Sequence, residues 1–501
     1  MATNGTPPTR SSLFSGILKG TALYSVAIVG QRIGSVVLLP INTRFLTTTD
    51  FGILDLLEKV GSLVSVLLGL NISAALGYFY FEKKSQEERS VVVSSLIAGV
   101  LLVGCVAAGV GIGLASPISR TVFHNIAVRP YVMLLFAGLP IAFALEAEFG
   151  WLRVVDRPVM YTTTSFLRLG VSVALTVVLL TVFRLRVLGV LISTLVAGIV
   201  ATTFLTWYCF REVRFGFSLP IFTRMSRFAV PLSLGTIGMF VIHFGDSFIL
   251  PQYRGFAELG IYSLAYKIGM LITMLSSAFY TYWSAQVFEV AQRDDSETVI
   301  ARIFTYFVLA VCFCSVALVL ICRPALRVMV AAPFQPAAAV APVIVLAYFL
   351  RALSSFFQSF FLVHARPAYD AICSWIAAAI CLVGYFTLIP RFGMWGAAWA
   401  TVLAFLCISL MSAAWTHRLR PFRLEGHRLA KIGLVSFFLL AVHYAMTAPS
   451  LIVDIARSAL LVAAFPGLLW ILRFPEVVEI DKLRSIIGRW RAVALERSGL
   501  T

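Results

Sequence analysis

Residues 52–61 read GILDLLEKVG and residues 260–269 read GIYSLAYKIG, so five of ten positions match at an offset of 208. Two further pairs keep nearly the same offset: Arg157-Pro158 with Arg366-Pro367 at 209, and LGVLISTLVA (188–197) with WGAAWATVLA (395–404) at 207. Three matches in the same order at a nearly constant offset indicate an internal repeat.

The composition around these matches is typical of a membrane protein. Of the 501 residues, 60% are hydrophobic and 13% are charged, whereas a soluble domain carries about 25% charged residues. This excludes a soluble enzyme, a nucleic-acid-binding module and a disordered scaffold. The formal net charge of +17 is explained by the excess of Lys and Arg that membrane proteins keep on their cytoplasmic side.

Apolar runs long enough to cross a bilayer, about 20 residues, divide the chain into predicted helices. There are fourteen candidates, at approximately 18–40, 52–80, 91–115, 131–155, 160–183, 187–210, 228–250, 259–284, 300–322, 337–363, 369–389, 393–415, 431–449 and 452–473. The connections between them are short, so the sequence leaves no room for an extramembrane domain. Any function is therefore carried out in or beside the bilayer.

The repeat groups these helices into two copies of a six-helix unit. An even number of helices per copy lets both copies enter the membrane from the same side, so the repeats are parallel, as in transporters whose site lies near the repeat interface. The fold class predicted is an all-α polytopic membrane protein of about 14 transmembrane helices, with two parallel six-helix repeats plus two extra C-terminal helices. The predicted parts are a cytoplasmic N-tail (1–17), an N-lobe (18–210), an inter-lobe linker (211–227), a C-lobe (228–415), helices 13 and 14 (431–473) and a basic amphipathic C-tail (474–501).

The orientation follows from the basic residues. With a cytoplasmic N-terminus, the tails and the loops on the same side carry 25 Lys and Arg residues, against 9 on the opposite side. The positive-inside rule therefore places both termini in the cytoplasm.

Ionisable residues inside the predicted spans are the candidates for function, because such residues usually face a bundle interior or a watery cavity. The candidates for substrate binding are the basic ones: Arg32, Lys59, Arg168, Lys267 and Arg351. The acidic ones are Asp55, Glu58, Glu146, Glu148 and Asp246. Five cations against five anions leave two interpretations open, mutual pairing or contact between the cations and an anionic ligand.

The repeat separates these interpretations at one pair of positions. Lys59 has Asp55 one helical turn before it, which predicts a local ion pair. Lys267 occupies the Lys59 position in the second copy, but Ser263 replaces the acid, which makes Lys267 the better candidate for an anionic ligand. Arg32 also has no acid one turn away, and its planar guanidinium suits bidentate phosphate recognition.

Coupling candidates lie on the seventh predicted helix, where His243 and Asp246 are three residues apart. They form either a proton- or cation-coupling pair, since His titrates near neutral pH, or a packed histidine hydrogen-bonded to a carboxylate. Glu146 and Glu148 lie on opposite sides of one helix, which argues against a carboxylate dyad. The sequence contains no phosphate loop, zinc signature or nucleophile elbow, and its eight cysteines lack metal-ligand spacing. No catalytic residue, metal site or cofactor is predicted.

The chain resembles the polysaccharide transporter (O-antigen or Wzx-type flippase) branch of the multidrug/oligosaccharidyl-lipid/polysaccharide exporter superfamily. The motifs that carry the resemblance are Leu39-Pro40-Ile41-Asn42-Thr43-Arg44-Phe45-Leu46, Asp50-Phe51-Gly52, Phe228-Ala229-Val230-Pro231, Asp246, Leu259-Gly260-Ile261-Tyr262, Ala265-Tyr266-Lys267, Gly393, Gly396-Ala397-Ala398 and Ala400-Thr401. They extend over roughly residues 15–415. One departure is Ser247, which follows Asp246 where the family often has a basic residue.

The resemblance implies a V-shaped pair of six-helix lobes around a cavity in the cytoplasmic membrane. It implies a flippase that moves a polyprenyl-diphosphate-linked oligosaccharide from the cytoplasmic to the outer leaflet by alternating access. Unpaired Arg32 and Lys267 on the two lobes would then hold the diphosphate. The implied partners are the lipid-linked oligosaccharide, membrane lipids, a polysaccharide polymerase and a chain-length regulator, with no nucleic acid. The driving force is left open between H⁺, Na⁺ and the membrane potential.

Three alternatives compete with this interpretation. A cation or multidrug exporter would use Asp246 and other acids, but cationic substrates prefer an acidic cavity and the interior here carries basic residues. A membrane enzyme such as a glycosyltransferase or polymerase would need a sizeable extracytoplasmic loop. A partner that only scaffolds such enzymes fits the duplicated architecture and the interior charges less well.

Overall fold

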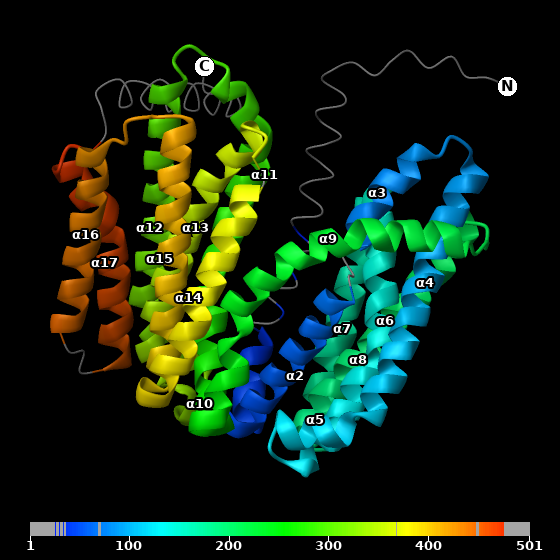
Figure 1. Ribbon diagram of the computed structural model, residues 1–501. Coiled ribbons are helices and arrows are strands. Elements are labelled where there is room, and N and C mark those ends of the chain that lie inside the picture. The colour runs from blue at the N-terminus through cyan, green and yellow to red at the C-terminus, as the bar shows by residue number, and fades with distance from the viewer. Residues whose placement is uncertain are drawn as a thin grey trace, which may run out of the picture. The chain divides into compact units, whose positions relative to one another are not determined.

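The computed structural model of the chain describes residues 26, 30, 34, 37–68, 72–366, 368–446 and 450–474, and within these ranges every regular element is a helix. The first helices, shown in Figure 1, are α2 (Thr48–Leu67), α3 (Ile72–Glu82), α4 (Gln86–Gly113), α5 (Ala115–Thr121), α6 (Arg129–Val154), α7 (Pro158–Thr181), α8 (Arg186–Glu212) and α9 (Leu219–Phe244). They are followed by α10 (Asp246–Gly269), α11 (Leu271–Ala291), α12 (Ser296–Met329), α13 (Ala337–Val363), α14 (Ala368–Phe392), α15 (Met394–Leu419), α16 (Gly426–Ala445) and α17 (Leu451–Ile471). Two 3₁₀ turns, η1 (Ile126–Val128) and η2 (Ala332–Phe334), complete the order.

Eleven helical segments among the described residues are long and apolar enough to cross a membrane. Most of the predicted helix 7 and all of the predicted helix 8 fall within one of them, Thr236–Ser284. That segment is interrupted at Gly255, whose φ of 80° and ψ of 170° are not helical. The predicted helix 2 corresponds to both α2 and α3, and most of the predicted helix 1 lies outside the described residues. An all-α multi-pass membrane fold is thus confirmed, and the exact number of fourteen spans stays a prediction.

The chain forms two compact units. Unit 1 comprises Met1–Leu264, Met329–Ala337 and Ser374–Ala404, and unit 2 comprises Ala265–Val328, Ala338–Cys373 and Phe405–Thr501. Within unit 1, α6 packs against α4 and α8, and α8 also packs against α7 (Figure 1).

The repeat is visible in unit 1 where α2 of the first copy crosses α10 of the second. A Cβ atom on Gly52 would clash with the carbonyl oxygen of Phe256, and one on Gly260 would clash with that of Thr48. The same offset of 208 that relates the two glycines also relates the two carbonyls, so the contact is reciprocal, as in an interface built on a two-fold axis. Small residues allow this approach of two helix backbones.

Turn conformations repeat at the same spacing. Asp156 and Ala365 both have a φ of 52°, and Arg184 and Gly393 have φ values of 52° and 59°. Both pairs are 209 residues apart. Because positive φ is uncommon outside glycine, these coincidences confirm that the two halves of the chain share one backbone design.

Unit 2 is held by an aromatic core and by interhelical hydrogen bonds. The rings of Trp283 on α11 and Phe356 on α13 stack with centroids 5.3 Å apart. Hydroxyl groups on α15 donate to carbonyls of α13, from Ser409 to Leu350 at 2.7 Å and from Thr416 to Phe357 at 2.9 Å.

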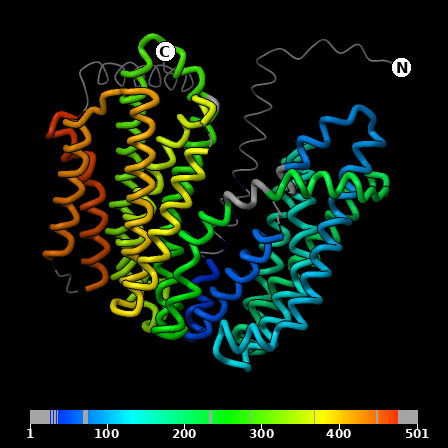
Figure 2. Tube along the Cα trace, in the orientation of Figure 1, coloured from blue at the N-terminus to red at the C-terminus, as the bar shows by residue number. Residues whose placement is uncertain are grey.

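The two helices beyond the repeat pack against α12. Figure 2 shows α16 and α17, coloured orange and red, side by side in the C-terminal part of the trace. The fully buried carboxylate of Asp454 on α17 pairs with Arg327 of α12 at 3.4 Å and with Arg457 at 2.5 Å. These pairs compensate the negative charge of Asp454 near the start of the last predicted span.

Candidate substrate and coupling sites

A buried polar network in unit 1 starts at Lys59 on α2. Its Nζ lies 2.5 Å from Asp55 Oδ2, one turn earlier, and donates to Ser247 Oγ on α10 at 2.5 Å. Lys59 and Asp55 are only 7% and 4% exposed. The predicted ion pair in the first copy is therefore present, and Lys59 also reaches a helix of the second copy.

Asp246, the first residue of α10, continues the network. Its carboxylate accepts hydrogen bonds from Tyr262 Oη at 2.6 Å and from Ser247 Oγ at 3.1 Å, and it is fully buried. Lys59 is close enough to Asp246 to interact electrostatically. Two carboxylates thus share one ammonium group in a buried setting, where an uncompensated charge is costly.

The contacts of Ser247 show what takes the place of the basic residue that the family often has at this position. The resemblance expects a basic residue after Asp246, and here that position carries a hydroxyl group that contacts both Lys59 and Asp246. The positive charge that position 247 lacks is supplied by Lys59 from α2. The network therefore depends on a contact between residues 188 positions apart.

Lys267 has different surroundings from its counterpart. Its side chain is exposed on unit 2, whereas Ser263, which replaces the acid, is buried and donates to the carbonyl of Gly260 at 3.1 Å. Lys267 does make an interaction in the structure, and its role in substrate binding stays a prediction. What distinguishes it from Lys59 is exposure.

Arg351 lies near the middle of α13 in unit 2 and is partly exposed. Its Nη1 donates to Ser354 Oγ at 2.9 Å, Ser355 Oγ at 2.8 Å and Gln358 Oε1 at 2.9 Å. Tyr280 on α11 and Asp370 on α14 are close enough to interact electrostatically with the guanidinium. All of its hydrogen-bond partners are neutral.

The remaining predicted residues do not join these clusters. Arg168 on α7 is partly exposed and interacts electrostatically with Glu146 of α6. His243 is partly exposed with its ring 5.9 Å from that of Phe244, and the hydrogen bonds of Asp246 go to other residues. The structure therefore does not bring His243 and Asp246 together as a hydrogen-bonded pair, and their coupling role stays a prediction. Arg32 lies outside the described residues.

Glu146 and Glu148 lie on opposite faces of α6, as their spacing predicts. The Glu146 side chain is 56% exposed and pairs with Arg153 at 3.1 Å. Glu148 is fully buried, and one of its oxygens accepts a hydrogen bond from Thr206 on α8. The other oxygen has no hydrogen-bond partner among the residues that the structure describes.

Several residues of these clusters were not identified as candidates from the sequence. Gln358, Ser354 and Ser355 follow Arg351 at helical spacings, a signal that was available because such neighbours share a face. Tyr280 precedes Arg351 by 71 residues, and no local pattern links the two. Tyr262 appeared only as part of a motif, without a role.

Outside the spans, the loop between α11 and α12 carries a charged pair. Arg293 donates to both carboxylate oxygens of Asp295, at 2.9 and 3.1 Å. These hydrogen bonds hold the pKa of the Asp295 carboxyl below its usual range. No group of three or more His, Cys, Asp or Glu side chains suited to a metal ion occurs in the described part of the chain.

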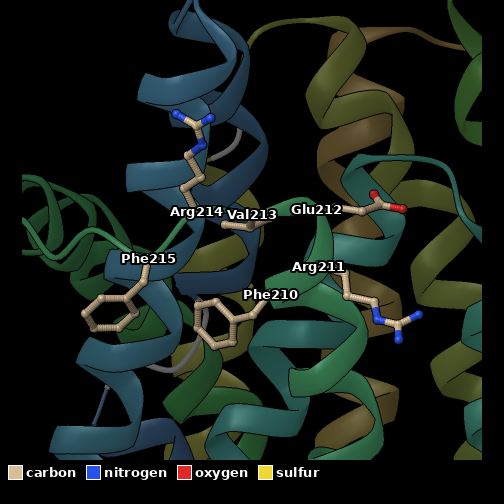
Figure 3. Close-up of a pocket in the computed structure, with 6 residues that line it drawn as sticks. All are labelled: Phe210, Arg211, Glu212, Val213, Arg214 and Phe215. Carbon is tan, nitrogen blue, oxygen red and sulfur yellow. The ribbon is translucent and has the colours of Figure 1, made fainter.

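A surface pocket of about 520 Å³ lies where α8 ends and the predicted inter-lobe linker begins. Figure 3 shows the rings of Phe210 and Phe215 on one side, with Arg211 and Glu212 pointing to the other. The ring centroids are 5.9 Å apart, and Arg214 pairs with Glu87 at 3.2 Å. Aromatic and arginine side chains together suit a membrane–water interface. None of the predicted site residues lines this pocket.

The helices define a multi-pass membrane protein. The chain belongs to the polysaccharide biosynthesis protein family, whose model matches residues 17–283. A search of curated proteins found no match.

Solved structures of transporters share the fold. The structure of the lipid II flippase MurJ in an inward closed conformation has a TM-score of 0.72 at 13% identity, covering 91% of this chain and 100% of that chain. An inward-facing multidrug resistance MATE family transporter of the MOP superfamily has a TM-score of 0.58 at 16% identity, covering 80% and 94%. A MOP superfamily transporter from Pyrococcus furiosus, titled for the reversed polarity of its binding pocket, has a TM-score of 0.58 at 14% identity, covering 83% and 96%. The fold of the superfamily predicted from the sequence is confirmed.

Proposed function

We propose that the protein is a flippase, not an enzyme, which moves a polyprenyl-diphosphate-linked oligosaccharide across the cytoplasmic membrane for cell-surface polysaccharide biosynthesis. Membership of the polysaccharide biosynthesis protein family and the fold shared with a lipid flippase support this. Both termini lie in the cytoplasm, as the distribution of basic residues indicates. A polysaccharide polymerase and a chain-length regulator are its expected partners.

The exposed Lys267 is the observation that carries the proposal. Lys267 lies twelve residues after Gly255, where the chain turns, which places it about 18 Å along the helix and near the middle of the bilayer. A lysine at that depth costs about 2.5–3.5 kcal/mol on insertion scales. Lys267 is exposed on unit 2, and the cost of placing its ammonium group in lipid favours a side chain that faces water or an anionic substrate. A diphosphate is the anion that the family's lipid-linked substrate would bring.

The coupling ion is proposed to bind at Asp246. Asp55, Lys59 and Asp246 together carry two negative charges and one positive charge when all are ionised, so a bound H⁺ or Na⁺ completes the balance. Release of that ion would strengthen the attraction between Lys59 and the two carboxylates. Transport driven by a proton or sodium gradient should therefore be lost in Asp246→Asn, and the gradient that drives the wild type identifies the ion.

Reconstitution tests the function directly. Proteoliposomes carrying a fluorescent polyprenyl-diphosphate oligosaccharide are treated with a membrane-impermeant quencher, so that flipping appears as loss of the protected fluorescence. We expect wild type to flip the lipid, and Lys267→Ala and Arg32→Ala, each normally inserted, to flip it more slowly. Lys84→Ala, in the exposed loop between α3 and α4, is the matched control. Wild-type rates in both site variants would refute the proposal.

A multidrug exporter is the second candidate, because the chain shares its fold with a multidrug transporter and because Asp246 is a buried acid. Native mass spectrometry of the purified protein separates the two. A co-purified polyprenyl-diphosphate sugar that is lost in Lys267→Ala supports the flippase. Retention of bulk phospholipid alone, with tight binding of cationic dyes, supports the exporter.

A further inference from the structure

A second cluster of hydrogen-bond donors lies in unit 2, around Arg351. Arg351 is the fifteenth of the 27 residues of α13, so it lies near the middle of a membrane-spanning helix. None of the described carboxylates forms an ion pair with it, and its Nη1 is tethered by the oxygens of Ser354, Ser355 and Gln358. A guanidinium at this depth is costly. Its hydrogen-bond acceptors are neutral, and Asp370 on α14 interacts with it electrostatically without forming an ion pair.

The tether leaves the other edge of the guanidinium available. Three oxygens occupy Nη1, whereas Nε and Nη2 donate to none of the described residues, although Arg351 is partly exposed. The Nε–Nη2 edge is the one that arginine uses for bidentate contact with a carboxylate or phosphate. The hydrogen bonds of Nη1 therefore orient the guanidinium and leave its Nε–Nη2 edge available to a ligand.

Two further donors lie near the guanidinium of Arg351. Gln358 accepts from Arg351 through Oε1, and its buried Nε2 has no hydrogen-bond partner among the described residues. The buried hydroxyl of Tyr280 is likewise without one, and it is close enough to Arg351 to interact electrostatically. Buried donors without partners are rare in folded proteins. Two of them beside a cation that forms no ion pair with the described carboxylates indicate a ligand that accepts hydrogen bonds and carries negative charge.

We propose that Arg351, Gln358 and Tyr280 form an oxyanion subsite for the transported lipid-linked saccharide. The inference rests on the proposed flippase function and adds a place on α11 and α13 where the substrate is held. The ligand is a group with at least two anionic oxygens, carried either by the diphosphate or by an acidic sugar. Arg351 contacts two of its oxygens through Nε and Nη2, and Gln358 Nε2 and Tyr280 Oη donate to the same group.

Binding measurements on the full-length protein in detergent test the subsite. The probes are farnesyl diphosphate, which carries the diphosphate on a short prenyl chain, and D-glucuronate, which carries a sugar carboxylate. We expect Arg351→Lys, which keeps the charge but loses the fork, to weaken binding about tenfold, and Tyr280→Phe to weaken it about threefold to tenfold. Tyr282→Phe, on the same helix with its side chain 69% exposed, is the matched control and keeps wild-type affinity.

The outcomes separate the subsite from the function. Loss of affinity for farnesyl diphosphate alone assigns the subsite to the diphosphate, and loss for glucuronate alone assigns it to an acidic sugar. If wild type binds a probe and both variants bind it equally well, the subsite is refuted while the flippase proposal stands. If wild type binds neither probe, the subsite proposal and the flippase proposal are both contradicted. Unchanged unfolding temperatures in Arg351→Lys and Tyr280→Phe show that lost affinity is not lost folding.

Discussion

The helices α2 and α10 carry the same motif in the two copies of the repeat, yet they have kept one feature of it and changed another. The glycines Gly52 and Gly260 face each other, and each excludes a side chain that would meet the partner helix. The lysines seven residues further on in each copy have opposite surroundings. Lys59 is buried against Asp55 and Ser247, whereas Lys267 is exposed.

The shared glycine contact is a structural feature of the fold, whereas the different surroundings of the two lysines bear on function. A reciprocal contact between backbones cannot be changed in one copy without changing the other, because each glycine makes room for the opposite helix. A side chain on the surface of one copy has no such restraint. The crossing is therefore alike in the two copies, whereas the position that carries Asp55 in the first copy carries Ser263 in the second. Variants that treat the two copies alike test this comparison.

The largest difference is expected when the two lysines lose their charge. Lys59→Met leaves Asp55 and Asp246 buried without their cation, which should lower the free energy of unfolding by about 3–5 kcal/mol. Lys267→Met changes an exposed residue and should lower it by less than about 0.5 kcal/mol. Unfolding of the detergent-solubilised protein measures both.

A control tests the cause of that loss. Removing Asp55 as well, in the double variant Asp55→Ala/Lys59→Met, takes away one of the stranded charges and should recover part of the stability. Equal losses for the two lysine variants would contradict the assignment of Lys59 to a buried network.

The glycine crossing should respond equally from both sides. Gly52→Ala and Gly260→Ala each force a Cβ atom against a carbonyl of the other helix, and overpacking of this kind costs about 1–3 kcal/mol. Gly109→Ala is the matched control, because its Cβ would meet nothing within 4 Å. Apparent unfolding temperatures check the set. A clear loss in only one of the two crossing variants would show that the contact is not reciprocal.

Transport should respond when the second copy is made to resemble the first. Ser263→Asp restores an acid one turn before Lys267 and pairs it as Asp55 pairs Lys59. We expect flipping in proteoliposomes to slow about tenfold, since a charge-assisted hydrogen bond to the substrate is worth about 1.5–3 kcal/mol. Ser263→Asn has the same shape without the charge and should flip the lipid faster than Ser263→Asp. Equal rates in the two variants would remove Lys267 from the substrate site.

The repeat explains why so much of the fold could be predicted. Matching residues at a constant offset impose the same backbone, which agrees with the equal φ values of Asp156 and Ala365. The local pair of Lys59 with Asp55 follows from helical spacing. These features depend on neighbours along the chain or on an equivalent position in the other copy.

Other contacts had no such pattern. The bond from Lys59 to Ser247 joins residues 188 positions apart, and the proximity of Tyr280 to Arg351 depends on the packing of α11 against α13. Packing of distant segments is decided by the shapes of all their side chains together. For the same reason, the hydrogen-bond partners of Asp246 turned out to be Tyr262 and Ser247 rather than the nearby His243.

The smallest difference is expected at the turn that the two copies share. Asp156 and Ala365 both adopt a φ of 52°, a conformation that costs most residues about 1–2 kcal/mol but that Asp tolerates better than Ala. Ala365→Gly relieves this strain at some cost in chain entropy and should raise the free energy of unfolding by about 0.5 kcal/mol. Asp156→Gly has less strain to relieve and should give no gain. Unfolding of the two variants side by side checks the order, and a larger gain at Asp156 would show that the turns, although alike in backbone, are strained differently.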